Sequence, residues 1–152
     1  MNNKEKKVIE TVDRLGDAIL DFTKRLVAEP STLGNEAGAV AVMEKELQKL
    51  GFSTALIPLE NSSLKTHAGF APVPWSLEGR NNVVGTLEPE GTGGRSALFN
   101  GHLDVVPVGN AGFWNREPFA PVVEGDWLYG RGAGDMKSGV AAMTYAVHAI
   151  RQ

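Results

Sequence analysis

Three residues of this sequence, His102, Asp104 and Asp135, have the types and the surroundings of a metal site. His102 and Asp104 are two positions apart after an apolar run, so on extended backbone their side chains point to the same side. Asp135 follows the glycine-rich segment 130–134 and directly precedes a helical pattern. An imidazole and two carboxylates that converge at strand ends suit a divalent metal ion, zinc above all.

Each of these residues also has a simpler structural explanation. His102 can be a hydrogen-bonded histidine near a strand end, and Asp135 can be the N-cap of the following helix. The glycines before Asp135 favour ligation, because a helix cap does not need them. We therefore predict His102 and Asp135 as metal ligands. We predict that Asp104 accepts the other imidazole N–H and fixes the tautomer of His102.

Two longer motifs resemble the N-terminal signatures of the M20 metallopeptidases. They are HLDVVP at 102–107 and GAGDMKSG at 132–139, and the resemblance runs from about Asn82 to the end of the chain. The family includes acetylornithine deacetylase, succinyl-diaminopimelate desuccinylase and aminoacylases. Two long motifs in the same order are a far more specific signal than a lone His-x-Asp.

The resemblance implies a metal-dependent hydrolase that cleaves an amide bond of N-acyl amino acids, of the acetylornithine or succinyl-diaminopimelate type. A metallo-exopeptidase or dipeptidase acting on short peptides is the alternative. The resemblance also implies two zinc ions, or cobalt or manganese in their place, bridged by Asp135. Asp104 would belong to the catalytic set, and a cis peptide bond would follow Asp135.

In the family, a Glu-Glu pair, a further acidic ligand and a final histidine follow these motifs, and one Glu is the general base. This chain has no matching positions; Glu117 and Glu124 stand in other contexts. We therefore expect residues 1–152 to be the N-terminal part of an M20 catalytic domain, without the lid or dimerisation domain and the C-terminal half. We expect this part to be inactive alone and the intact protein to be a homodimer.

The composition argues against several classes of protein function. The chain has 152 residues, of which 42% are hydrophobic, enough for one core. Its net charge of −3 argues against a nucleic-acid partner, and no apolar run approaches the roughly 18 residues of a membrane span. The absence of cysteine excludes thiolate ligands, and it fits a reducing cytoplasm, as does a polar start that predicts no secretory signal.

The residue pattern predicts an α/β protein with a mixed β-sheet flanked by helices, and the resemblance implies a zinc-exopeptidase-like (phosphorylase/hydrolase-like) domain. Helices are expected at about 6–28, after a cap at Asn35, and after Asp135. Strands are expected at 52–57, 82–87 and 96–100, the last two forming an antiparallel hairpin across a turn at 88–95. A small hairpin is expected at 122–129, and long loops at 60–79 and 107–121.

Two other function classes remain. Gly130 to Ser138 is glycine-rich and contains a Lys-Ser pair, but Met136 stands where a nucleotide-binding P-loop needs glycine. A non-catalytic M20-like binding module is the other possibility. We interpret His67 as an exposed loop histidine and Lys137 and Arg131 as residues that support the loops by hydrogen bonds.

Overall fold

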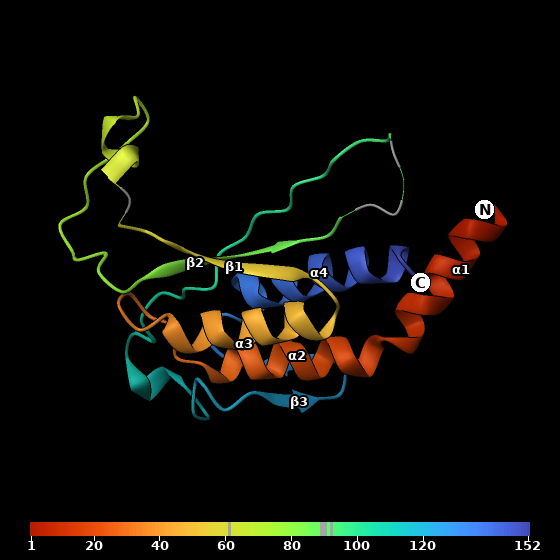
Figure 1. The fold of residues 1–152 in the computed structure, drawn as a ribbon. Helices are drawn as coiled ribbons and strands as arrows, with labels where there is room; N and C mark the ends of the chain where they lie inside the picture. Colours follow the sequence, from red (N-terminus) through yellow and green to blue (C-terminus); the bar gives the residue numbers. More distant parts are fainter. Residues whose placement is uncertain (61, 89–90, 92) are drawn as a thin grey trace.

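The computed structural model describes residues 1–60, 62–88, 91 and 93–152. Helices and two antiparallel strand pairs, joined by long connections, make up this part of the chain (Figure 1). The α-helices and strands are α1 (Asn3–Arg14), α2 (Gly16–Ala28), α3 (Ala37–Lys49), β1 (Ser53–Pro58), β2 (Asn81–Thr86), β3 (Val122–Glu124), β4 (Trp127–Tyr129) and α4 (Ser138–Ile150). Within these described ranges, no helix is both long and apolar enough to cross a lipid bilayer.

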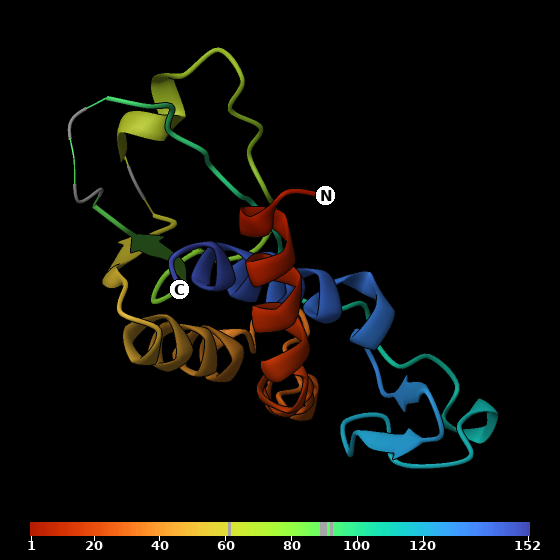
Figure 2. The same ribbon diagram turned by 90° about the vertical axis from the view of Figure 1, so that its right-hand side faces the viewer.

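The first helical segment is divided in two, which corrects the single helix expected over 6–28. α1 begins after a capping box formed by Asn2 and Glu5 and ends at Arg14, with Leu15 as its C-cap, and α2 starts at Gly16. Glycine has a low helix propensity, so interrupting the helix at Gly16 costs less free energy than at its neighbours. The two helices run in different directions (Figure 2). As a result, Ile9 of α1 is 49% exposed rather than part of a continuous buried stripe.

The segment between α2 and α3 also differs from the prediction at one point. α2 ends at Ala28, and its C-cap Glu29 has an extended backbone, as expected for a residue before proline. The N-cap of α3 is Glu36, not Asn35. The amide of Asn35 instead donates to the carbonyl oxygen of Pro30 at 2.9 Å, and so stabilises the linker rather than the helix.

The core lies between α2, α3 and α4. Its buried members are Phe22, Leu26, Met43, Leu47, Leu50, Val140, Ala141 and Tyr145. On α4, Tyr145 and Ala149 face the core, while Ile150 is 70% exposed. Within the core, the buried carboxylate of Glu46 accepts hydrogen bonds from Tyr145, Arg25 and Lys49, so one charged group links the three helices.

Among the described residues, neither the predicted mixed sheet nor the hairpin between 82–87 and 96–100 is formed. β2 pairs antiparallel with β1, from Ser53 opposite Thr86 to Pro58 opposite Asn81, and this ribbon packs against α3. Residues 96–100 have no strand structure, and Leu98 is 92% exposed rather than buried. Residues 87–95, which connect β2 to the segment 96–100, form a connection longer than the two to five residues typical of hairpin loops. Part of the predicted turn at 88–95 (residues 89, 90 and 92) lies outside the described residues.

The predicted small hairpin is confirmed. β3 and β4 pair antiparallel with Val122 opposite Tyr129, and Gly125 adopts a positive φ in the turn. The guanidinium of Arg116 lies 5.0 Å from the centre of the Tyr129 ring and also pairs with Glu124 at 2.8 Å. These contacts attach the loop 107–121 to the hairpin that leads into the Asp135 turn.

Candidate functional site

His102 and Asp135 lie in direct contact. Nε2 of His102 is 3.1 Å from Oδ1 of Asp135. On the other side of the ring, Nδ1 is 3.0 Å from the carbonyl oxygen of Asp104 and 3.4 Å from its carboxylate oxygen Oδ1. The structure thus brings together all three residues singled out from the sequence, from two segments that are far apart in the chain.

The surroundings of His102 favour its charged form. Partial burial is the largest single influence and lowers the pKa of His102, but it is outweighed. The hydrogen bond to the Asp104 carbonyl, the hydrogen bond to Asp135 and the charges of both carboxylates raise the pKa above its ordinary value. Both ring nitrogens face oxygen atoms. A metal ion would bind Nε2 in its deprotonated form, while a hydrogen bond from Nδ1–H to the Asp104 carbonyl would keep the ring oriented.

All three side chains are accessible to solvent. The exposed fraction is 46% for His102, 60% for Asp104 and 90% for Asp135. A carboxylate this exposed keeps lone pairs free for a ligand even while one oxygen contacts His102. The pair therefore offers one nitrogen and one carboxylate donor on an open surface.

Close packing determines the approach to Asp135. Gly132 has φ +80°, and a Cβ there would lie 2.4 Å from Cγ1 of Val105; a Cβ at Gly130 would lie equally close to Val27. At Gly134, nothing lies within 4 Å of the same position. Two of the three glycines are thus required by packing between this turn and its neighbours. The peptide bond between Asp135 and Met136 is cis, as the resemblance implied.

The supporting roles predicted for Arg131 and Lys137 are confirmed. Arg131 donates to the carbonyl oxygen of Val108 at 3.3 Å and lies over the ring of Trp114 at 5.0 Å. Lys137 is fully buried, and its ammonium donates to the carbonyl oxygens of Leu26 at 2.7 Å and Glu29 at 2.8 Å. Burial lowers the pKa of Lys137 to about 8, opposed by the charge of Glu29. A lysine held in this way cannot reach a phosphate group, which argues against the P-loop alternative.

The other candidate ligands lie elsewhere. His67 is exposed, and its Nδ1 accepts a hydrogen bond from the backbone N–H of Gly69. Glu124 pairs with Arg116, and His148 packs edge-on against Tyr145. Over residues 1–60, 62–88, 91 and 93–152, no group of three or more His, Asp or Glu side chains is arranged to hold a metal ion. The donor set suits zinc, but it supplies two ligands where a catalytic zinc has about three.

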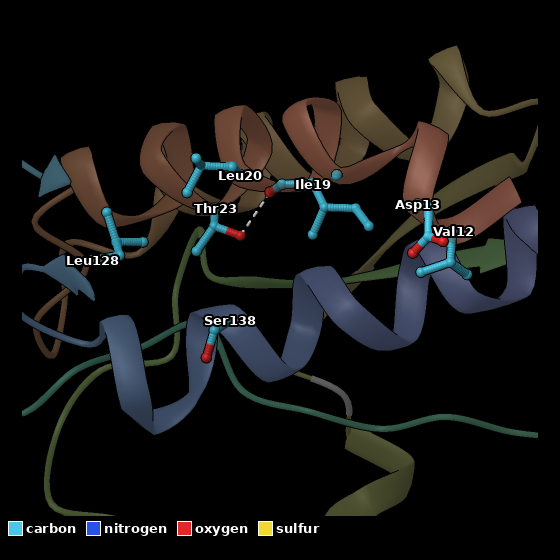
Figure 3. A pocket seen from close by; sticks show the side chains of 8 residues that line it. Val12, Asp13, Ile19, Leu20, Thr23, Leu128 and Ser138 are labelled. Atoms are coloured by element: carbon cyan, nitrogen blue, oxygen red, sulfur yellow. Dashed lines mark hydrogen bonds between the residues drawn. The ribbon is translucent and has the colours of Figure 1, made fainter. Parts of the chain in front are cut away.

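One hollow on the described surface lies away from this site. It has a volume of about 470 Å³, is open to solvent and lies between the α1–α2 junction, β4 and the start of α4 (Figure 3). Its lining is mainly apolar, including Ile19, Leu20 and Leu128, and it contains none of the three candidate residues. The chemistry of the surface therefore points to the His102–Asp135 pair, not to the hollow.

The fold and the site together define an α/β protein with a histidine–carboxylate pair at the ends of two loops. Comparison with known proteins shows which family this part of the chain resembles. Residues 98–152, which include all three candidate residues, match the family model described as Peptidase family M20/M25/M40. Over this segment the chain is similar to the M20 family.

Curated relatives extend the similarity towards the N-terminus. The chain is 38% identical over 127 residues to a protein of Dinoroseobacter shibae and 35% identical over 136 residues to one of Dechloromonas aromatica, both named succinyl-diaminopimelate desuccinylase. These matches cover 82% and 90% of this chain, but only 28% and 30% of the relatives. The chain therefore spans less than a third of the length of these relatives.

Sequence reasoning missed two features of the site. It did not predict that Lys137 is buried, although a lysine two residues after a candidate ligand could have been examined for a structural partner. It also overlooked Ser31, which is fully buried and whose hydroxyl donates to the carbonyl oxygen of Leu103 at 2.6 Å. A serine in a short loop carries no local sign of so distant a contact.

Proposed function

We propose that residues 1–152 form the N-terminal part of the catalytic domain of a metal-dependent amide hydrolase. The observation that supports this most directly is the 3.1 Å contact between His102 Nε2 and Asp135 Oδ1, within the segment that matches the M20 family. The substrate class that we propose is an N-acyl amino acid. The names of the relatives favour an N-succinyl diamino acid within that class.

His102 and Asp135 would hold the metal, zinc or else cobalt or manganese. Asp104 would keep the imidazole oriented, because its carbonyl and carboxylate oxygens both face Nδ1. When bound, the metal supplies Lewis acidity towards the substrate carbonyl and lowers the pKa of a water molecule. The general base and the remaining ligands would come from residues beyond this chain, so we expect 1–152 alone to show no turnover. We also propose that the intact protein is a cytoplasmic homodimer.

A chimera provides the test. Residues 1–152 would replace the matching segment of the Dinoroseobacter shibae relative, and release of succinate from N-succinyl-diaminopimelate would be measured. We expect hydrolysis that is lost with His102→Ala and kept with His67→Ala, since His67 lies in an exposed loop outside the site. Circular dichroism would confirm that each chimera is folded.

The same chimera separates the alternatives. If the chimera hydrolyses N-acetylornithine or a dipeptide in preference to the succinyl substrate, the protein is still an amide hydrolase, but its substrate is an N-acetyl amino acid or a short peptide. A folded chimera that hydrolyses none of these amides, or one that keeps its activity with His102→Ala, would contradict the proposal. A folded chimera without any amide hydrolysis would favour a non-catalytic binding module.

A further inference from the structure

The short linker after α2, residues 29–31, contacts both halves of the candidate site. The hydroxyl of Ser31 donates to the carbonyl oxygen of Leu103 at 2.6 Å, and the carbonyl oxygen of Ser31 accepts from the backbone N–H of Val105 at 2.8 Å. Ser31 is fully buried and Val105 is 4% exposed. The chain on either side of Asp104 is therefore held at two points by a single residue.

The Asp135 turn is attached to the same linker from the other side. The ammonium of Lys137 donates to the carbonyl oxygens of Leu26 and Glu29, at the end of α2 and the start of the linker. The backbone N–H of Lys137 also donates to the carbonyl oxygen of Gly132 at 3.0 Å, which closes the turn around Asp135. Lys137 has no exposed surface, so water does not compete for these bonds.

The linker itself is restrained. Pro30 fixes one backbone angle, and the N–H groups of Ser31 and Thr32 donate to the carbonyl oxygens of Glu29 and Pro30, both at 2.8 Å. A restrained segment that binds both site segments can determine the distance between them. By contrast, the side chains of His102 and Asp135 are exposed, and their mutual contact is too accessible to water to set the geometry alone.

We propose that Ser31 and Lys137 are positioning residues, which fix the separation of His102 and Asp135 through the linker 29–31. Ser31 binds the backbone on either side of Asp104, and the Lys137 side chain attaches the Asp135 turn to the end of α2 and to the linker. The value of this arrangement for metal binding rests on the proposed function, whereas the positioning itself does not.

Nuclear magnetic resonance of the three histidine rings tests this inference. In the metal-free protein, we expect Ser31→Ala to shift the ring ¹⁵N signals of His102 towards those of Asp135→Asn. Thr144→Val is the matched control, because it also removes a buried hydroxyl that donates to a carbonyl, at 2.8 Å, but within α4. The control should leave the His102 signals unchanged.

Zinc titration of the same samples supplies the second measurement. Loss of groups that orient a metal ligand typically weakens affinity by about 10- to 100-fold, and we expect Ser31→Ala to lie near the lower value. Wild-type His102 signals and zinc affinity in Ser31→Ala, or equal changes in Thr144→Val, would overturn the inference. If the wild type binds no zinc but Ser31→Ala still alters the His102 signals, the metal site fails and the positioning role stands.

Two further measurements remain decisive if Ser31→Ala does not fold. In the wild type, the amide proton of Val105 should exchange slowly, because it is bonded to Ser31; exchange as fast as in an exposed loop would overturn the inference. Lys137→Met removes the bonds to Leu26 and Glu29 while keeping a side chain of similar length. We expect this variant to alter the His102 signals, and unchanged signals would likewise overturn the inference.

Discussion

Nε2 of His102 lies 3.1 Å from Oδ1 of Asp135, although 33 residues separate them in the sequence. The two side chains meet because their segments are held by buried residues, Val105 and Lys137, rather than by their own exposed contact. A pair of donors already in place needs little reorganisation to bind a metal ion. This relationship leads to predictions about the turn, the core and the exposed surface.

The first prediction concerns the turn before Asp135. Gly132→Ala should lower the free energy of unfolding by about 1–3 kcal/mol, because a non-glycine residue is strained in the left-handed region. The added methyl group would also collide with Val105, which lies beside the His102 segment. Chemical denaturation and zinc titration would measure both effects.

Gly134→Ala is the control for that experiment. A Cβ at Gly134 meets nothing within 4 Å, so this variant should keep nearly wild-type stability. Equal destabilisation of the two variants would show that packing against Val105 does not determine the turn.

The second prediction concerns Glu46 in the core. Replacing it by Gln should lower the free energy of unfolding by about 2 kcal/mol at neutral pH, because hydrogen bonds to a charged group are lost from Tyr145, Arg25 and Lys49. Urea denaturation would measure the loss. Glu44→Gln, in the same helix but with only a 3.4 Å contact to Thr54, should cost much less.

This stabilisation should depend on pH in one direction. Burial is the largest influence and raises the pKa of Glu46, but the hydrogen bonds from Tyr145, Arg25 and Lys49 together lower it below its ordinary value. A carboxylate with a lowered pKa in the folded state stabilises the fold above its unfolded pKa, about 4.3, and loses this contribution as pH falls through the folded pKa. The difference between wild type and Glu46→Gln should therefore shrink in acid; a difference that grows there would contradict the account.

The third prediction concerns exposed apolar residues. Leu98 is 92% exposed and Phe99 is 57% exposed, and large exposed apolar patches favour association. We expect 1–152 to self-associate in sedimentation experiments and Leu98→Ser/Phe99→Ser to reduce this. Leu33→Ser, which removes an exposed leucine at a separate position, is the control. A wild type that sediments as a monomer at all concentrations would contradict the prediction.

The local signals of the sequence predicted much of the secondary structure. The hairpin of β3 and β4 formed as expected, because Gly125-Asp126 marks the turn between two short apolar runs. The strand at 96–100 did not form, since the apolar pattern of Leu98 and Phe99 specifies a preference for burial but not a partner. The pairing of β2 with β1 depends on contacts across a long connection, which no local pattern reveals.

In the candidate site, too, the sequence indicates the local features but not the contacts between distant segments. The residue types and their spacing were sufficient to select His102, Asp104 and Asp135, and the structure places them together. The groups that hold them there, Ser31 and Lys137, act through backbone atoms more than 70 residues away in sequence. Because a backbone carbonyl is present at every residue, sequence alone does not show which one a buried lysine or serine will bind.

The most direct test of the central claim is calorimetric titration of 1–152 with zinc, for wild type, His102→Ala and Asp135→Ala. We predict that the wild type binds about one zinc ion weakly, because this chain supplies two ligands where a catalytic site has about three. Both variants should lose this binding. Zinc binding that is unchanged in either variant would contradict the assignment of His102 and Asp135 as the metal ligands of this chain.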